Sequence, residues 1–105
     1  PVGIDIEKPS LKLVRVKHKF LNAVEENEVQ EDLHKLCIYW ATKESLYKLY
    51  GRKQLSLKQN IAIRLIRWPL APIIEADIFL EGRSTSFQLC TLFWDEFYIV
   101  YSMMH

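Results

Sequence analysis

Two short segments of the sequence carry side chains that could hold a cation and a phosphate next to each other. They are residues 3–7, near the start, and residues 40–48. Mg²⁺ prefers carboxylate oxygens as its protein ligands, and ammonium groups balance phosphate charge. If the two segments meet in the fold, the protein is expected to handle a phosphorylated substrate through magnesium. Together they supply three carboxylates and two lysines: Asp5, Glu7, Glu44, Lys43 and Lys48.

The first segment is expected to present its two acids on one face of a strand. Residues Val2–Glu7 alternate apolar and polar side chains, which is the pattern of a β-strand. Alternate side chains of a strand point the same way, so Asp5 and Glu7 share one face and Ile4 and Ile6 share the other. By itself this pair indicates a metal site only weakly, because an exposed strand edge can carry the same pattern.

The second segment contains an acid where a helix pattern calls for an apolar residue. Glu44 continues a stripe at helical spacing formed by Leu33, Leu36, Trp40 and Tyr47. A carboxylate on such a face needs a cation, a metal ion or a shifted pKa. The alternative explanation is an ordinary ion pair with Lys48, four residues further along the same helix.

The first half of the chain supplies a strand and helices that would position these acids. Ser10 can cap a helix over residues 11–21, and residues 22–29 are expected to form a loop or a short helix. A long helix is predicted over residues 31–50, with Gly51 ending it.

The second half changes to stretches rich in β-branched and aromatic residues, separated by turn residues. We expect these stretches to be antiparallel strands joined by turns. The predicted fold is α+β, with an antiparallel sheet of four to five strands packed against one long helix. The predicted strands are residues 61–68, 74–81, 86–93 and Phe97–Met103.

Composition indicates one ordinary globular domain. The chain has 105 residues, and 14 basic and 13 acidic residues leave a net charge of +1, which gives no indication of a nucleic-acid or membrane partner. No stretch reaches the roughly 18 apolar residues of a membrane helix. Cys37 and Cys90 do not have the spacing of metal ligands. We expect both to be buried free thiols, which suits the cytoplasm.

Charges are unevenly placed in the first third of the chain. A basic stretch over residues 8–19 contains no acid, and an acidic stretch follows over residues 25–32. The simplest interpretation is that both are solvent-exposed faces of helices. The alternative is that the basic stretch receives an acidic partner. Their members are Lys8, Lys12, Arg15, Lys17 and Lys19, followed by Glu25, Glu26, Glu28, Glu31 and Asp32.

Taken together, the two segments resemble the 4′-phosphopantetheinyl transferase superfamily. The family motifs G-x-D-x-E and W-x-x-K-E-x-x-x-K match residues 3–7 and 40–48, complete and in the right order. Smaller elements also fit, and the resemblance covers essentially the whole chain. It implies transfer of the phosphopantetheine arm of coenzyme A onto a serine of an acyl or peptidyl carrier protein, which leaves 3′,5′-ADP.

The resemblance also implies a role for each singled-out residue. Asp5, Glu7 and Glu44 match the magnesium-binding acids of the family. Glu44 would in addition be the base for the serine hydroxyl, directly or through a water molecule. Lys43 and Lys48 match positions near the phosphates of coenzyme A, and Lys48 is also a candidate for supporting catalysis. Carrier proteins are acidic, which favours the basic stretch as their docking surface.

The family has two main forms, and this sequence is closer to the longer one. The short form is about this size and works as a trimer with its site between subunits. The surfactin-synthetase type is about twice as long and holds its site between two similar halves. Glu7 and the helix motif beginning at Trp40 resemble the second half of the long form. We therefore expect residues 1–105 to be its C-terminal domain, completed by an N-terminal half or by self-association.

Two alternatives stay open at this point. One is the short homotrimeric holo-acyl-carrier-protein synthase, which performs the same chemistry by self-association. The other is a non-catalytic α+β interaction domain that keeps the fold without the activity.

Overall fold

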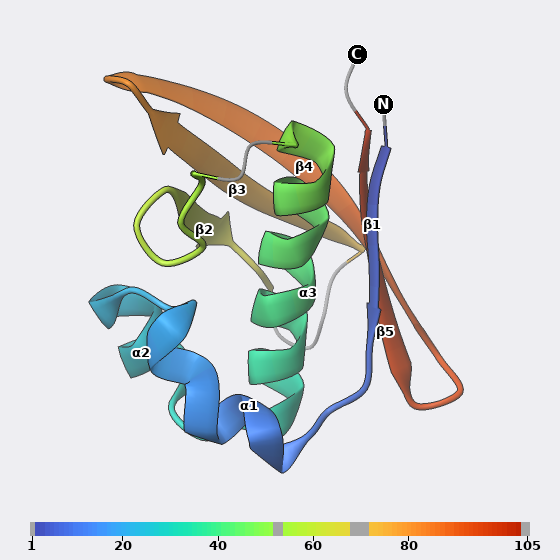
Figure 1. The fold of residues 1–105 in the computed structure, drawn as a ribbon. Coiled ribbons are helices and arrows are strands. Elements are labelled where there is room, and N and C mark those ends of the chain that lie inside the picture. Colours follow the sequence, from blue (N-terminus) through green and yellow to red (C-terminus); the bar gives the residue numbers. More distant parts are fainter. Residues whose placement is uncertain (1, 52–53, 68–71, 104–105) are drawn as a thin grey trace.

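The computed structural model describes residues 2–51, 54–67 and 72–103, which contain one antiparallel sheet and a long helix packed on it (Figure 1). The predicted α+β fold is confirmed. The sheet has the strand order β1-β5-β4-β3-β2, so the last four strands form a meander and the first strand of the chain pairs with the last. The strands are β1 (Val2–Glu7), β2 (Ile61–Leu65), β3 (Ile73–Leu80), β4 (Arg83–Trp94) and β5 (Phe97–Met103).

The long helix α3 (Leu33–Tyr50) lies across one face of the sheet, mainly against β1 and β5 (Figure 1). It begins two residues later than predicted because Asp32 caps it, its side chain accepting hydrogen bonds from the backbone N–H groups of His34 and Lys35. Gly51 ends it in a left-handed conformation with φ of 72°, as expected. None of the described helices is long and apolar enough to cross a membrane.

The prediction of a helix over residues 11–21 is wrong in its length. Helix α1 (Leu11–Val16) begins after the Ser10 cap, as expected, and is followed by a single 3-10 turn, η1 (Lys17–Lys19). The helix ends early because Phe20 and Leu21 are completely buried, so the chain must turn there into the core. The short helix considered for residues 22–29 is present as α2 (Ala23–Val29).

The strand predictions differ from the structure mostly at their ends. Strand β4 is longer at both ends than the predicted residues 86–93, because tight turns at 81–82 and 95–96 let pairing continue up to them. All four turn residues have positive φ, as two-residue hairpin loops of type I′ require. Strand β2 ends at Leu65, after a register shift against β3, and is shorter than predicted. The predicted end of that strand at Trp68 and most of the turn after it lie outside the described residues.

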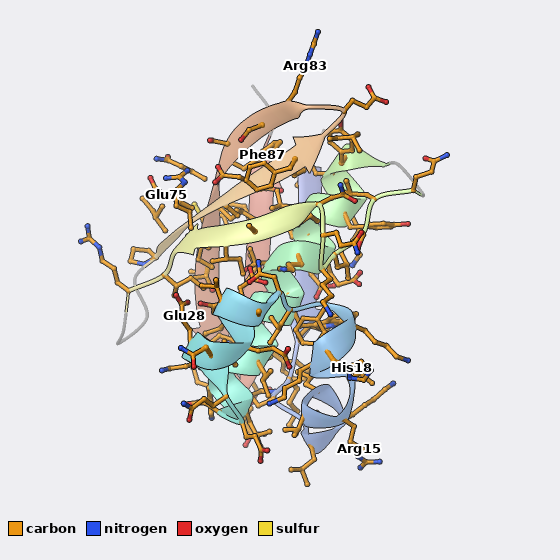
Figure 2. All side chains as sticks on the ribbon, turned by 90° about the vertical axis from the view of Figure 1, so that its left-hand side faces the viewer. Arg15, His18, Glu28, Glu75, Arg83 and Phe87 are labelled. Atoms are coloured by element: carbon orange, nitrogen blue, oxygen red, sulfur yellow. The ribbon has the colours of Figure 1, made fainter. Side chains whose placement is uncertain are left out.

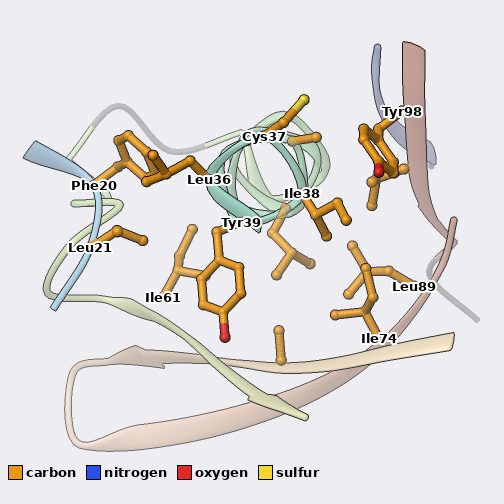
Figure 3. Close-up of a cluster of buried hydrophobic side chains, with 14 of the residues drawn as sticks. Phe20, Leu21, Leu36, Cys37, Ile38, Tyr39, Ile61, Ile74, Leu89 and Tyr98 are labelled. Atoms are coloured by element: carbon orange, nitrogen blue, oxygen red, sulfur yellow. The ribbon is translucent and has the colours of Figure 1, made fainter. Parts of the chain in front are cut away.

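The core lies between α3 and the concave face of the sheet (Figure 3). Ile38 and Tyr39 point from α3 toward the strands that carry Ile74 and Leu89, and Cys37 points to the other side of the helix. Cys37 is fully buried, as predicted. Burial first, and then the charges of nearby acids, raises the pKa of its thiol to about 12. The prediction for Cys90 is wrong, since this thiol is only partly buried.

Strand β1 alternates as predicted but has an unusual orientation. Its polar face, with Asp5, lies against α3, and its apolar side chains point outward on the other face of the sheet. Cross-strand pairing with β5 and β4 continues this apolar surface, because Ile6 pairs with Ile99 and Ile99 with Leu92. We call it the apolar outer face. Its most exposed members on these strands are Val2, Ile4, Ile6, Leu92, Trp94 and Phe97.

Candidate metal and phosphate site

The two segments that the sequence singles out lie side by side, because α3 packs directly on β1. The hydroxyl of Ser45 donates a hydrogen bond of 2.8 Å to the carbonyl oxygen of Gly3. This approach is possible only because Gly3 has no side chain, since a Cβ there would overlap the backbone carbonyl oxygen of Ser45. The contact places the end of β1, with Asp5 and Glu7, opposite the middle of α3.

Asp5 is buried at this contact, with one carboxylate oxygen paired and the other not. The ammonium of Lys48 lies 2.7 Å from Asp5 Oδ1 and also donates to the backbone oxygen of Ile4. The hydrogen bond to Asp5 is the largest of the effects that raise the pKa of Lys48. Asp5 Oδ2 is buried and has no hydrogen-bond partner among the residues that the structure describes. An unpaired carboxylate oxygen in such a position is costly, so this one is suited to a ligand.

Glu7 lies beside Asp5 and is held by the indole of Trp40, whose Nε1–H donates to Glu7 Oε1 at 3.0 Å. Burial raises the pKa of Glu7, and contact with Asp5 raises it further, to about 7. The charge of Glu44 acts in the same direction, while the bond from Trp40 opposes the shift. Near neutral pH Glu7 therefore takes up a proton readily, as a partly buried carboxyl with little positive charge around it does.

Glu44 faces the same cluster from α3 and is partly buried. Burial raises the pKa of its carboxyl, the charge of Asp5 adds to the rise, and the ammonium of Lys48 opposes it. The ion pair of Lys48 is formed across elements with Asp5 and not with Glu44, its partner along the helix. Glu44 is therefore a partly buried acid whose negative charge calls for a compensating cation, as the sequence pattern indicated.

This cluster has the charge and the oxygen donors that suit a magnesium ion. Asp5 offers an unpaired oxygen, and Glu7 has a raised pKa that a cation would lower again. Within the described part of the chain, no three His, Cys, Asp or Glu side chains converge closely enough to hold one metal ion. Mg²⁺ ordinarily takes one or two protein carboxylates and completes its shell with water and substrate phosphate. Asp5 and Glu7 fit that pattern, with Glu44 next to them.

Lys43 lies apart from this cluster, although the sequence places it next to Glu44. Its side chain is fully buried, and its ammonium donates to Glu25 Oε1 at 2.6 Å and to the backbone oxygens of Phe20 and Leu57 at 2.8 and 2.9 Å. Burial lowers the pKa of Lys43, and the carboxylate of Glu25 opposes the shift. The structure therefore does not place Lys43 among the acids. It also shows that the solvent-exposed interpretation of the acidic stretch is wrong for Glu25.

A cavity of about 460 Å³ opens next to Glu7. Its wall is largely apolar, and the ring of Trp40 packs edge-on against Phe20 with 5.0 Å between ring centroids. Lysines of the basic stretch line this cavity. Arg15 and His18 belong to the same stretch but are not among the lining residues, and they lie in the lower part of the view in Figure 2. Sequence reasoning missed this pocket, although apolar residues spaced between the lysines were a usable signal. The lining residues are Glu7, Lys8, Ser10, Lys12, Leu13, Val16, Lys19, Phe20, Trp40 and Leu57.

Changing Glu7 to glutamine is expected to flatten the pH dependence of stability of the metal-free protein. The folded protein binds the Glu7 proton more tightly than the unfolded chain does, because its pKa is about 7 instead of 4.5. Stability from this group is therefore fully present below pH 4.5 and is lost as the pH rises through about 7. Urea unfolding at about pH 5 and about pH 8, with EDTA present, should show a smaller loss for Glu7→Gln than for the wild type. Equal losses would contradict the raised pKa, and Glu31→Gln, which changes an exposed acid, is the control.

Comparison with known families gives one result. A family model described as the 4′-phosphopantetheinyl transferase superfamily matches residues 1–99. The matched region contains β1, α3 and every residue of the acidic cluster. Comparison with curated proteins gives no match.

Proposed function

Since the chain belongs to the 4′-phosphopantetheinyl transferase superfamily, we propose that it transfers the 4′-phosphopantetheine group of coenzyme A to a serine of an acyl or peptidyl carrier protein. The reaction would depend on Mg²⁺. The observation that carries this proposal is the meeting of Asp5, Glu7 and Glu44 where β1 packs on α3, with an unpaired oxygen on Asp5. This grouping of acids from both family motifs supports the proposal.

Each residue of the cluster has a role that its geometry suits. Glu44 accepts the proton of the serine hydroxyl, directly or through water, and its raised pKa makes it a better base near neutral pH. The serine oxygen then bonds to the phosphorus of the phosphopantetheine group, and the bond from that phosphorus to the oxygen of 3′,5′-ADP breaks. Held by Asp5 and Glu7, Mg²⁺ would neutralise charge on the pyrophosphate. Lys48 is half-exposed beside Asp5 and can add positive charge there.

The cavity beside Glu7 suits the pantetheine arm of coenzyme A. Ligand pockets have volumes of roughly 300–1,000 Å³ and combine an apolar wall with a few polar groups. At about 460 Å³, with Trp40 and Phe20 in its wall, this cavity has that character. The lysines around it, Lys8, Lys12 and Lys19, favour an acidic carrier protein as the partner that approaches from this side.

The apolar outer face supports a second folded unit as a further partner. Exposed apolar residues that form a continuous patch usually mark an interaction surface. On this face Ile6 is 55% exposed and Trp94 71% exposed. We infer that either the N-terminal half of a surfactin-synthetase-type transferase or another copy of this chain covers it. That unit would also supply the part of the coenzyme site that binds adenine.

The decisive experiment measures transfer of label from fluorescent coenzyme A to an apo carrier protein, with Mg²⁺ and with EDTA. We expect labelling of the carrier that EDTA abolishes. The proposal fails if neither transfer nor coenzyme A binding is found. Light scattering on the same sample distinguishes the two forms, because a trimer indicates the short synthase and a monomer or loose dimer indicates half of the longer enzyme.

A further inference from the structure

A buried ion pair lies on the far side of α3 from the acidic cluster. Lys43 is completely buried and Glu25 is 2% exposed, and their charged groups are 2.6 Å apart. The three protons of the Lys43 ammonium have three acceptors, which are Glu25 and the backbone oxygens of Phe20 and Leu57. No donor of this group is left for a phosphate.

Glu25 is satisfied just as fully, and it connects three elements. Its Oε1 accepts the backbone N–H of Asn22, completing the capping box at the start of α2. Its Oε2 accepts the backbone N–H of Ile63 in β2. Buried polar networks that are complete in this way fix the relative positions of the elements they join. Lys43 and Glu25 therefore hold α2, β2 and α3 together.

The same ion pair supports the pocket beside Glu7. Phe20 and Leu57, whose carbonyl oxygens bind Lys43, both line that pocket. The ring of Phe20 packs on Trp40, and the indole of Trp40 donates to Glu7. A short chain of contacts thus leads from Lys43 through two aromatic side chains to one of the acids.

Helix geometry separates the two lysines of the motif. Positions five apart on a helix differ by about 140° around its axis. Lys48 therefore faces Asp5 and the open side of the site, while Lys43 faces Glu25 and the interior. The two lysines of the motif therefore have different surroundings, and we expect them to have different roles.

We propose that Lys43 and Glu25 are a positioning pair, which fixes the pocket wall and the indole of Trp40 and does not bind the phosphates of coenzyme A. The ligand whose binding depends on the pair is the uncharged pantetheine arm. The inference rests on the proposed function for the identity of that ligand, but the position of Trp40 can be measured without it.

The first test compares two fragments of coenzyme A on the full chain, using Lys43→Met in a Trp68→Phe/Trp94→Phe background. Trp40 is then the only tryptophan, because the sequence has three. We expect the affinity for pantetheine to fall by about tenfold or more, and the affinity for 3′,5′-ADP with Mg²⁺ to stay unchanged. Lys48→Met is the matched control and should show the reverse. A loss of 3′,5′-ADP binding in Lys43→Met, or no loss of pantetheine binding, overturns the proposal.

The fluorescence emission of Trp40, measured without any ligand, tests this proposal independently of the proposed function. If the wild type binds neither fragment, the proposed function fails, yet the pair still predicts an altered Trp40 emission in Lys43→Met. An emission spectrum identical to that of the parent overturns the positioning role.

A measurement on the unaltered protein covers the case in which Lys43→Met does not fold. The ammonium groups of Lys43 and Lys48 can be followed by nitrogen-15 NMR during titration with 3′,5′-ADP and Mg²⁺. We expect the Lys48 signal to shift and the Lys43 signal to stay in place. A Lys43 shift as large as that of Lys48 would show direct phosphate contact and overturn the proposal.

Discussion

Replacing Gly3 by alanine is expected to destabilise the fold by about 3 kcal/mol or more, at or above the upper end of ordinary overpacking. The new Cβ would overlap the backbone oxygen of Ser45 and lie 2.8 Å from Leu49 Cβ and 3.0 Å from Leu49 N. Two of these atoms belong to the backbone of α3, so no change of side-chain rotamer relieves the clash. The helix must move away from β1. Denaturant unfolding of both proteins measures the difference.

The same substitution is expected to reduce transfer in whatever fraction of the protein stays folded. Asp5 and Glu44 come from the two elements that Gly3 brings together, so a shift of the helix separates them. Misplacement by about 1 Å can cost about 10²-fold in rate. Gly82→Ala is the control, because Gly82 has open space around it and only a left-handed backbone to strain, worth about 1–2 kcal/mol. A Gly3→Ala protein as stable as the wild type would show that this contact does not fix the site.

The elements that hold the site follow from local patterns, which explains why the sequence predicts them. Alternation over six residues specifies β1, and the apolar stripe together with Gly51 specifies α3. Both patterns depend only on residues that are close in the sequence, a few positions apart for the strand and within about two turns for the helix. The meeting of Asp5 with the middle of α3 is not local, and the sequence offers it only as a condition that a shared ligand would require.

Orientation of β1 could not be predicted, because alternation shows that two faces differ and not which one is inside. An ordinary amphipathic strand turns its apolar face to the core. Here Asp5 faces α3 and Ile4 faces outward. The reason lies in Gly3 and Asp5 themselves, since the first lets α3 approach and the second has an ionic partner on it, Lys48.

Glu25 is a clearer example of a contact that the sequence does not predict. It stands among four other acids in the acidic stretch, and composition treats all five alike. The capping-box spacing from Asn22 was a signal that Glu25 differs, but its partner Lys43 lies 18 residues away in the next helix. Pairing at that distance depends on how α2 docks on α3, which no local pattern records.

Replacing Glu44 by glutamine is expected to reduce transfer by about 10²–10⁴-fold in the active assembly, the usual contribution of a general base. Glutamine keeps the size and the polarity of the side chain but cannot take the proton of the serine hydroxyl. The rate of label transfer at saturating coenzyme A and Mg²⁺ measures the loss. Glu31→Gln, on an exposed acid, should leave that rate unchanged. Comparable rates for Glu44→Gln and the wild type would rule out the role of Glu44 as the base.

We expect the Glu44→Gln protein to fold as the wild type does. Loss of transfer without loss of stability distinguishes a catalytic role from a structural one. Burial and the charge of Asp5 raise the pKa of Glu44, so the folded protein binds this proton more tightly than the unfolded chain and loses stability when Glu44 ionises. Glutamine removes that ionisation, and the variant is expected to be as stable as the wild type at neutral pH, or slightly more stable. As a base, Glu44 must be deprotonated, so its raised pKa also moves the rising limb of the wild-type pH–rate profile toward neutral pH. The residual activity of Glu44→Gln should lack that limb, an outcome that simple destabilisation would not produce.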